Sequence, residues 1–493
     1  MKQLRFLWII SVIFAATSCG NNWLDLESSI SIDTETSIRS LKDIEFTLNG
    51  IYSTMQNSDA YSGRLVYYGD ATGDDMQAVS STKRVANYYR FNFTKDNGPS
   101  SHWAYLYFII QNCNLILHNI DKIPVGEKEK GHAADLKGQT LAIRGMALFD
   151  LTRIFGYPYA KDNGRSLGVA IVETLPDIHS KPARNTVAEC YAKVIDDLTA
   201  SVGLLGGKFN KGKFNKWAAM TLLSRVYLYK GENAPALKTA REAIAGAEKN
   251  GYALWTNEAY PTAWSNDASA ANPGEVLFEI VNLTTDTPGK ESMGYLSSKD
   301  GYDDICITCS FYRLLKEDPK DVRLKLLSFD KKYYAYVNKY QPQQNEAIQD
   351  ANIPLIRLSE AYLNAAEAAV KTGDNKTAVK YLDPIVKRAN PANTVEGKSL
   401  TVEDVLNERR KELVGEGHRM YDVIRNGMKV KRKDVEERNL SKTKHDTPYM
   451  EYDWNFYMIV LPIPKKEMDT NPNMVQNPGY GGVTNVPRPP LSR

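Results

Sequence analysis

The architecture of this chain is indicated by the segment Trp217-Ala-Ala-Met-Thr-Leu-Leu-Ser-Arg-Val-Tyr-Leu-Tyr-Lys230, which Gly231 follows directly. Its small and apolar side chains recur at steps of three and four residues, which predicts a helix with a buried face. After Gly231 the same spacing returns at Ala236, Leu237, Ala240, Ala243 and Ile244. The expected unit is therefore a helix, a glycine turn and a second helix.

This unit recurs along the chain. Leu355 to Lys371 repeats it 142 residues later, so that Ala219 registers with Ala361, Gly231 with Gly373, and Ala236 with Ala378. Alanine at helix contacts and a repeat of about 34 residues are typical of tetratricopeptide-like repeats. We predict a mainly α fold with such helix pairs near 141–205, 214–248 and 353–390, and a few short strands such as Val276 to Ile280.

Two long insertions interrupt the helical pattern, at residues 58–100 and 251–310. Both are polar, contain glycine and are rich in tyrosine. Loops on a rigid scaffold commonly carry binding residues. We therefore expect an irregular, loop-rich ligand-binding half beside the helical scaffold.

The N-terminus has the pattern of a secretory signal. Lys2 and Arg5 precede a nearly apolar run from Phe6 to Ala16, and small residues lead to Cys19. The pattern resembles the lipobox of bacterial lipoproteins, which implies a signal peptide at 1–18, a lipid on Cys19 and a tether at 19–36. An ordinary secretory signal cut near Ser18 is the alternative.

Composition narrows the class of protein. The 493 residues include 62 basic and 59 acidic side chains, a net charge of +3 that is too small for a sequence-independent nucleic-acid binder. Mean hydropathy is −0.43, and no apolar run is long enough to predict a membrane-spanning helix. Loss of Lys2 and Arg5 with the signal peptide leaves 60 basic against 59 acidic residues. A lipid, not charge, would then hold the protein to a membrane.

Three sequence blocks resemble the SusD/RagB family of Bacteroidetes outer-membrane lipoproteins. They are Ile353 to Glu367, Asn407 to Asp422, and Leu461-Pro-Ile-Pro464 running on to Tyr480. The resemblance implies a single SusD-like domain over 37–493 at the cell surface. It also implies an oligosaccharide ligand and a partner SusC-like TonB-dependent transporter. A RagB-like peptide ligand is the alternative.

The second block has a structural interpretation of its own. Thr401 with Asp404 three residues later resembles a helix capping box. Glu416, His418, Arg419 and Asp422 are expected to fasten the end of this segment to the fold as polar clamps.

The sequence contains no nucleophile elbow, HExxH, phosphate-binding loop or dinucleotide fingerprint, and its six histidines lack metal-ligand spacing. We therefore expect no enzyme activity, no cofactor and no metal. A glycosidase, which needs two carboxylates, and a protein-binding scaffold stay open as alternatives. Cys306 and Cys309 are expected to form a loop disulfide or to be two inert thiols.

Glycan binding suits the tyrosine-rich insertions because sugars present apolar C–H faces and hydroxyl edges to flat aromatic rings with polar neighbours. The candidate ligand contacts are chosen by residue type and loop position, since no motif transfers them. They are Asp74, Tyr88, Tyr89 and Arg90 in the first insertion and Trp264, Tyr295 and Tyr302 in the second.

Overall fold

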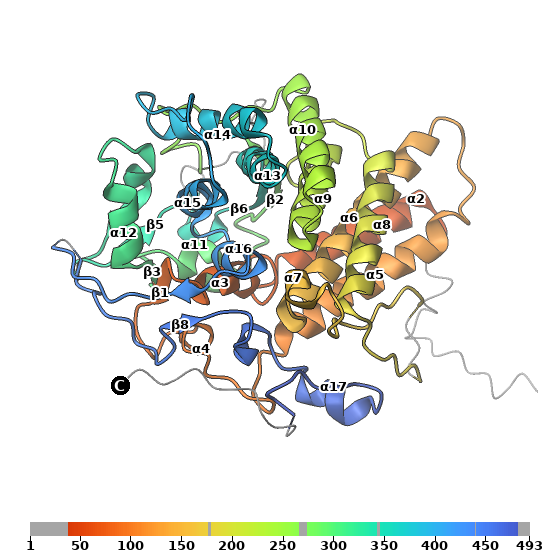
Figure 1. Ribbon diagram of the computed structural model, residues 1–493. Helices are drawn as coiled ribbons and strands as arrows, with labels where there is room; N and C mark the ends of the chain where they lie inside the picture. Colours follow the sequence, from red (N-terminus) through yellow and green to blue (C-terminus); the bar gives the residue numbers. More distant parts are fainter. Residues whose placement is uncertain (1–37, 176–178, 266–273, 343–345, 439, 482–493) are drawn as a thin grey trace, which may run out of the picture.

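The structure is a computed structural model that describes residues 38–175, 179–265, 274–342, 346–438 and 440–481. Its long helices pack side by side in chain order, each against the next (Figure 1). They are α2 (Leu41–Met55), α5 (Ser101–Ile120), α6 (Lys130–Phe155), α8 (Val187–Leu204), α9 (Lys216–Lys230), α10 (Asn233–Lys249), α13 (Leu358–Lys371) and α14 (Asn375–Ala389). The predicted mainly α fold is confirmed.

The two registered helix pairs are α9 with α10 and α13 with α14. All four alanines of the register, Ala219, Ala236, Ala361 and Ala378, are fully buried. Gly231 and Gly373 follow the first helix of each pair with φ of +85° and +78°. Only glycine adopts this left-handed conformation without strain, which explains its place between the helices.

Shorter elements build the other half, at the left in Figure 1. The strands pair antiparallel across long stretches of chain: β1 (Met76–Ala78) with β3 (Ile305–Ile307), β2 (Val276–Ile280) with β6 (Ile353–Arg357), β4 (Leu327–Phe329) with β5 (Ala335–Val337), and β7 (Val430–Lys431) with β8 (Glu451–Tyr452). The remaining helices are α3 (Arg64–Ala71), α4 (Ala86–Tyr89), α7 (Tyr159–Asp162), α11 (Met293–Leu296), α12 (Cys309–Lys316), α15 (Val402–Leu413), α16 (Arg419–Arg425), α17 (Lys465–Thr470) and the 3₁₀ turns η2 (Gly289–Glu291), η3 (Val322–Leu326), η4 (Ile348–Asp350) and η5 (Tyr457–Ile459).

The first insertion is more regular than predicted. Residues 58–100 contain α3, which is buried from Leu65 to Ala71 and packs against α16. A helix of eight residues makes only about two turns, which is too short for a helical period to stand out in the sequence. The expectation of purely irregular surface structure was wrong here for that reason.

A buried network of charges joins the two halves at Arg357. Its Nη1 donates to Glu275 and, at 3.0 Å, to Glu412, while Nε and Nη2 donate to Glu416 at 2.7 and 2.6 Å. Although burial opposes ionisation, Arg388 and Arg357 hold the pKa of Glu412 at about 2. Each buried charge thus has a partner, which is the condition for stability in a low-dielectric interior.

The clamp predicted at the end of α15 is confirmed for three of its four residues. Glu416 pairs with Arg357, Arg419 with Asp74 at 2.6 Å, and Asp422 with Arg409 at 3.1 Å. The capping box of Thr401 and Asp404 is present as well. His418 differs: its Nδ1 has no hydrogen-bond partner among the described residues, and burial lowers its pKa well below the usual range.

Cys306 and Cys309 are free thiols, so the loop disulfide is excluded and the alternative of two inert thiols holds. Burial raises the pKa of Cys306 to about 12 and that of Cys309 to about 11. Since the thiolate is the reactive form, neither side chain is poised for chemistry. Within the described ranges, no helix is both long and apolar enough to cross a membrane.

Candidate functional site

A surface cluster of aromatic and charged side chains forms where the two insertions meet. Arg84, in the turn before α4, places its guanidinium carbon 3.9 Å from the ring centre of Tyr302, in the turn before β3. The Tyr295 ring of α11 meets Tyr302 edge to face at 4.9 Å. Glu291 of η2 accepts from Arg84 Nε at 3.1 Å. We call these four residues the Arg84–Tyr302 cluster.

Hydrogen bonds to the backbone of Tyr302 hold the cluster in place. The Tyr302 N–H donates to the Tyr295 carbonyl at 2.9 Å, and Lys83 Nζ donates to the Tyr302 carbonyl at 2.5 Å. Lys83 also pairs with Asp303. These backbone contacts fix the Tyr302 ring while both tyrosine rings stay half-exposed.

Asp304 lies directly behind these side chains. Its side chain is fully buried, with Arg84 Nη1 3.6 Å from Oδ1. Neither carboxylate oxygen accepts a hydrogen bond from any residue that the structure describes. Burial raises the pKa of Asp304 to about 6, against the opposing effect of Arg84 and Lys83.

This arrangement has the residue types that sugar-binding sites use. A partly exposed aromatic face beside a guanidinium and carboxylates offers stacking area together with donors and acceptors for hydroxyl groups. Pre-formed contacts lower the entropy that binding would cost. Across the described part of the chain no group of three or more His, Cys, Asp or Glu is placed to hold a metal ion.

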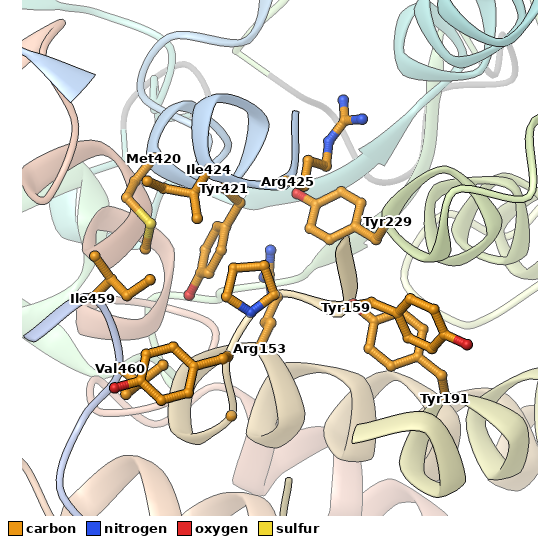
Figure 2. Close-up of a pocket in the computed structure, with 13 residues that line it drawn as sticks. Arg153, Tyr159, Tyr191, Tyr229, Met420, Tyr421, Ile424, Arg425, Ile459 and Val460 are labelled. Carbon is orange, nitrogen blue, oxygen red and sulfur yellow. The ribbon is translucent and has the colours of Figure 1, made fainter. Parts of the chain in front are cut away.

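A second tyrosine-rich site proves too small for a glycan. Figure 2 shows a pocket walled by Tyr159, Tyr191, Tyr229 and Tyr421, with Arg153 at its base. Its cavity volume is ≈ 20 Å³. Because one water needs about 10–15 Å³ on this measure, the pocket has room for about one water molecule.

Four of the predicted ligand contacts lie in the interior. Asp74 pairs with Arg419, Tyr88 bonds to His102 Nε2 at 2.9 Å, Tyr89 bonds to His445 Nδ1 at 2.6 Å, and Trp264 is 1% exposed. A buried ring has no face to offer a ligand, so the prediction was wrong for these four residues. At these four positions the insertions fold back into the core.

The other three predicted residues are accessible. Arg90 is partly exposed and lies 3.6 Å from Asp446. Tyr295 and Tyr302 come together in the cluster. Sequence reasoning missed Arg84, Glu291 and Asp304, although charged pairs at Lys83-Arg84 and Lys290-Glu291 stand in or beside the predicted loops. Arg84 and Glu291 are 207 positions apart in the sequence, so nothing in the sequence indicated their contact.

Family models match both parts of the chain. Residues 319–480 match a model described as the SusD family. Residues 22–228 match a model described as starch-binding, associating with the outer membrane.

Two proteins of solved structure match over most of the chain, and a curated relative matches over part of it. A Bacteroides vulgatus protein of solved crystal structure is 79% identical, with a TM-score of 0.89 over 90% of this chain and 100% of that one. A SusD superfamily protein from the same organism is 38% identical, with a TM-score of 0.83 over 90% and 100%. The starch-binding protein SusD of Bacteroides thetaiotaomicron is 32% identical over 152 residues, 30% of this chain and 25% of that protein.

Proposed function

The chain belongs to the SusD family, and on this premise we propose that it captures an oligosaccharide at the cell surface and delivers it to a SusC-like TonB-dependent transporter. The protein carries out no covalent step in this proposal. Binding and docking are the whole of its function.

The observation that carries the proposal is the Arg84–Tyr302 cluster. Two half-exposed tyrosines, a stacked arginine and a carboxylate lie in contact range on the surface. The names of relatives support a glycan as the ligand, since a similar protein and a matching family model are described as starch-binding. Weak, reversible affinity suits a protein that must release its ligand.

The anchor proposed for this function is a lipid on Cys19, which lies outside the described residues together with the signal peptide and tether. The family description of association with the outer membrane supports it. Mass spectrometry of the mature N-terminus should find an acylated Cys19. An unmodified Cys19 would contradict the anchor.

Calorimetry tests the ligand class. The chain from residue 19 onward, with Cys19→Ser, is titrated with a panel of oligosaccharides and with short peptides. We expect at least one glycan to bind and no peptide to do so. Binding of peptides alone would favour the RagB-like alternative, and turnover of a glycan would favour a glycosidase.

A pull-down tests the transporter. The full-length protein is captured from intact outer membranes and its co-purifying proteins are identified. Recovery of a TonB-dependent barrel is expected. Its absence from a preparation that still binds glycan would overturn delivery but leave capture standing.

A further inference from the structure

A large groove shares no residue with the Arg84–Tyr302 cluster. It has a volume of ≈ 630 Å³ and lies between α5, residues 170–175 and 180–182, and α17 with the residues that follow it. Trp103, Tyr107 and Phe108 line one wall, and Pro182, Pro464 and Met474 lie among the residues that complete it. The walls are thus mainly aromatic and aliphatic.

The groove is a built feature of the fold. Tyr107 OH donates to the Ala170 carbonyl at 2.8 Å, and Asn471 Nδ2 donates to the Pro182 carbonyl at 2.9 Å. These bonds tie Ala170 to α5 and Pro182 to the residues after α17. The Trp103 and Tyr107 rings also contact each other, at 4.8 Å. Contacts within the fold therefore position the walls of the groove, and no bound partner is needed for this.

Apolar side chains are left uncovered at this groove. Phe108 is 52% exposed, and Val475, next to the lining residue Met474, is 55% exposed. With nothing bound, the groove has room for many waters against these apolar side chains. Covering such surface is favourable, which indicates a binding partner for the groove.

The chain has a suitable segment next to the groove. Gly481 packs on Gln476, whose side chain bonds to both Ile463 N and Ile463 O, beside Pro464 of the groove. After Gly481 come the twelve residues 482–493, which include Val486-Pro-Arg-Pro-Pro-Leu491. At about 3.3 Å per residue, the five residues from Gly481 to Val486 reach ~17 Å.

The chemistry of this segment matches the groove. Closely spaced prolines favour the extended polyproline II helix, which docks into grooves lined by aromatic rings at little entropic cost. Six residues in that form span ~19 Å. Glu467 is the one carboxylate among the described lining residues, which also include the two lysines Lys181 and Lys466. Arg488 gives the segment a guanidinium that can pair with Glu467.

We propose that residues 486–491 of the same chain occupy the groove between α5 and α17 as a polyproline II segment. The segment would cover Phe108 and Val475. This inference is independent of glycan capture at the Arg84–Tyr302 cluster.

A truncation with the segment added back tests the proposal. A variant ending at Gly481 is compared with the full chain, and the synthetic peptide 482–493 is titrated into both. We expect the peptide to bind the truncated variant and to bind the full chain at least tenfold more weakly, because the attached segment competes intramolecularly. Hydrogen exchange over 101–108 and 470–475 should rise on truncation and fall when peptide is added.

Two phenylalanine variants, one in the groove and one outside it, show where the peptide binds. In the truncated variant, Phe108→Ala should abolish peptide binding. Phe46→Ala, on α2 and 62% exposed, should leave it unchanged. If truncation prevents folding, the full chain with Pro487, Pro489 and Pro490 changed to glycine serves instead and should gain binding of the wild-type peptide.

Three results would overturn the proposal. They are equal peptide binding by the full and shortened chains, no binding by either, and loss of glycan affinity on Phe108→Ala. The last result would assign the groove to the glycan.

Discussion

Arg357 stacks on Trp264 at 4.8 Å and Arg84 stacks on Tyr302 at 3.9 Å, and in both places glutamate completes the cluster. The two clusters differ in burial. The Arg357 side chain is 1% exposed and its glutamate partners are buried, whereas the Arg84 side chain is 34% exposed and its partner Glu291 is 33% exposed. The same residue types thus hold the fold together in one place and are available to a ligand in the other.

This difference shows why residue type alone misplaced several ligand contacts. Trp264 and Tyr302 stand in the same tyrosine- and tryptophan-rich insertion, and both satisfy the criteria for a sugar platform. What separates them is the side chains packed on the far side of each ring. Those come from residues distant in sequence, such as Lys339 and Arg357 around Trp264.

The largest expected effect is at the buried cluster. Arg357→Ala leaves Glu275, Glu412 and Glu416 buried without a cation that all three share, and removing one partner of a buried pair typically costs about 3–5 kcal/mol of unfolding free energy. Urea denaturation measures it. Arg84→Ala is the matched control and should cost less than about 1 kcal/mol, as for exposed ion pairs. Equal losses for the two variants would remove the distinction between the clusters.

The scaffold can be weakened without touching either cluster. At Gly231 an added Cβ meets no atom within 4 Å, so Gly231→Ala introduces only left-handed backbone strain at φ +85°. We expect a loss of about 1–2 kcal/mol in unfolding free energy. Gly373→Ala, at φ +78°, should behave alike. Glycan affinity measured on the folded variants should be unchanged, and a change in it would couple the scaffold to the ligand site.

A smaller, pH-dependent effect is expected at Asp304. Its folded pKa of about 6 lies above the unfolded value of 3.8, so the folded state binds the proton more tightly. The wild-type protein should therefore lose stability relative to Asp304→Asn as pH rises from about 4 to 6, with no further divergence above that. Thermal unfolding across this range checks it. Parallel pH profiles for the two proteins would show that Asp304 is not perturbed.

Much of the helical fold can be predicted from the sequence, because Ala219, Ala361 and their partners repeat at a fixed spacing. The strand at Val276–Ile280 can also be predicted from the sequence. Helix α3 cannot, since its eight residues are too few for a helical period to stand out. In the candidate site, Tyr295 and Tyr302 could be predicted from loop position. Arg84 and Asp304 could not, because their roles depend on contacts between the two insertions.

The smallest effect is expected at the thiols. Cys306 and Cys309 are buried with raised pKa values, so an alkylating reagent at pH 8 should not modify them in the folded protein. Reductant should leave the unfolding temperature unchanged, since no disulfide joins them. Rapid modification without denaturant would contradict the burial described for this region.

The central claim is that the Arg84–Tyr302 cluster is the ligand site. It is tested most directly by titrating two aromatic variants with a glycan that binds in the oligosaccharide panel. Tyr302→Ala should weaken affinity at least tenfold, about 1.4 kcal/mol, with an unchanged urea midpoint. Trp264→Ala should instead lose about 3–5 kcal/mol of stability, while its folded fraction binds normally. Wild-type affinity in Tyr302→Ala, or selective loss of affinity in a stable Trp264→Ala, would contradict the assignment of the Arg84–Tyr302 cluster as the ligand site.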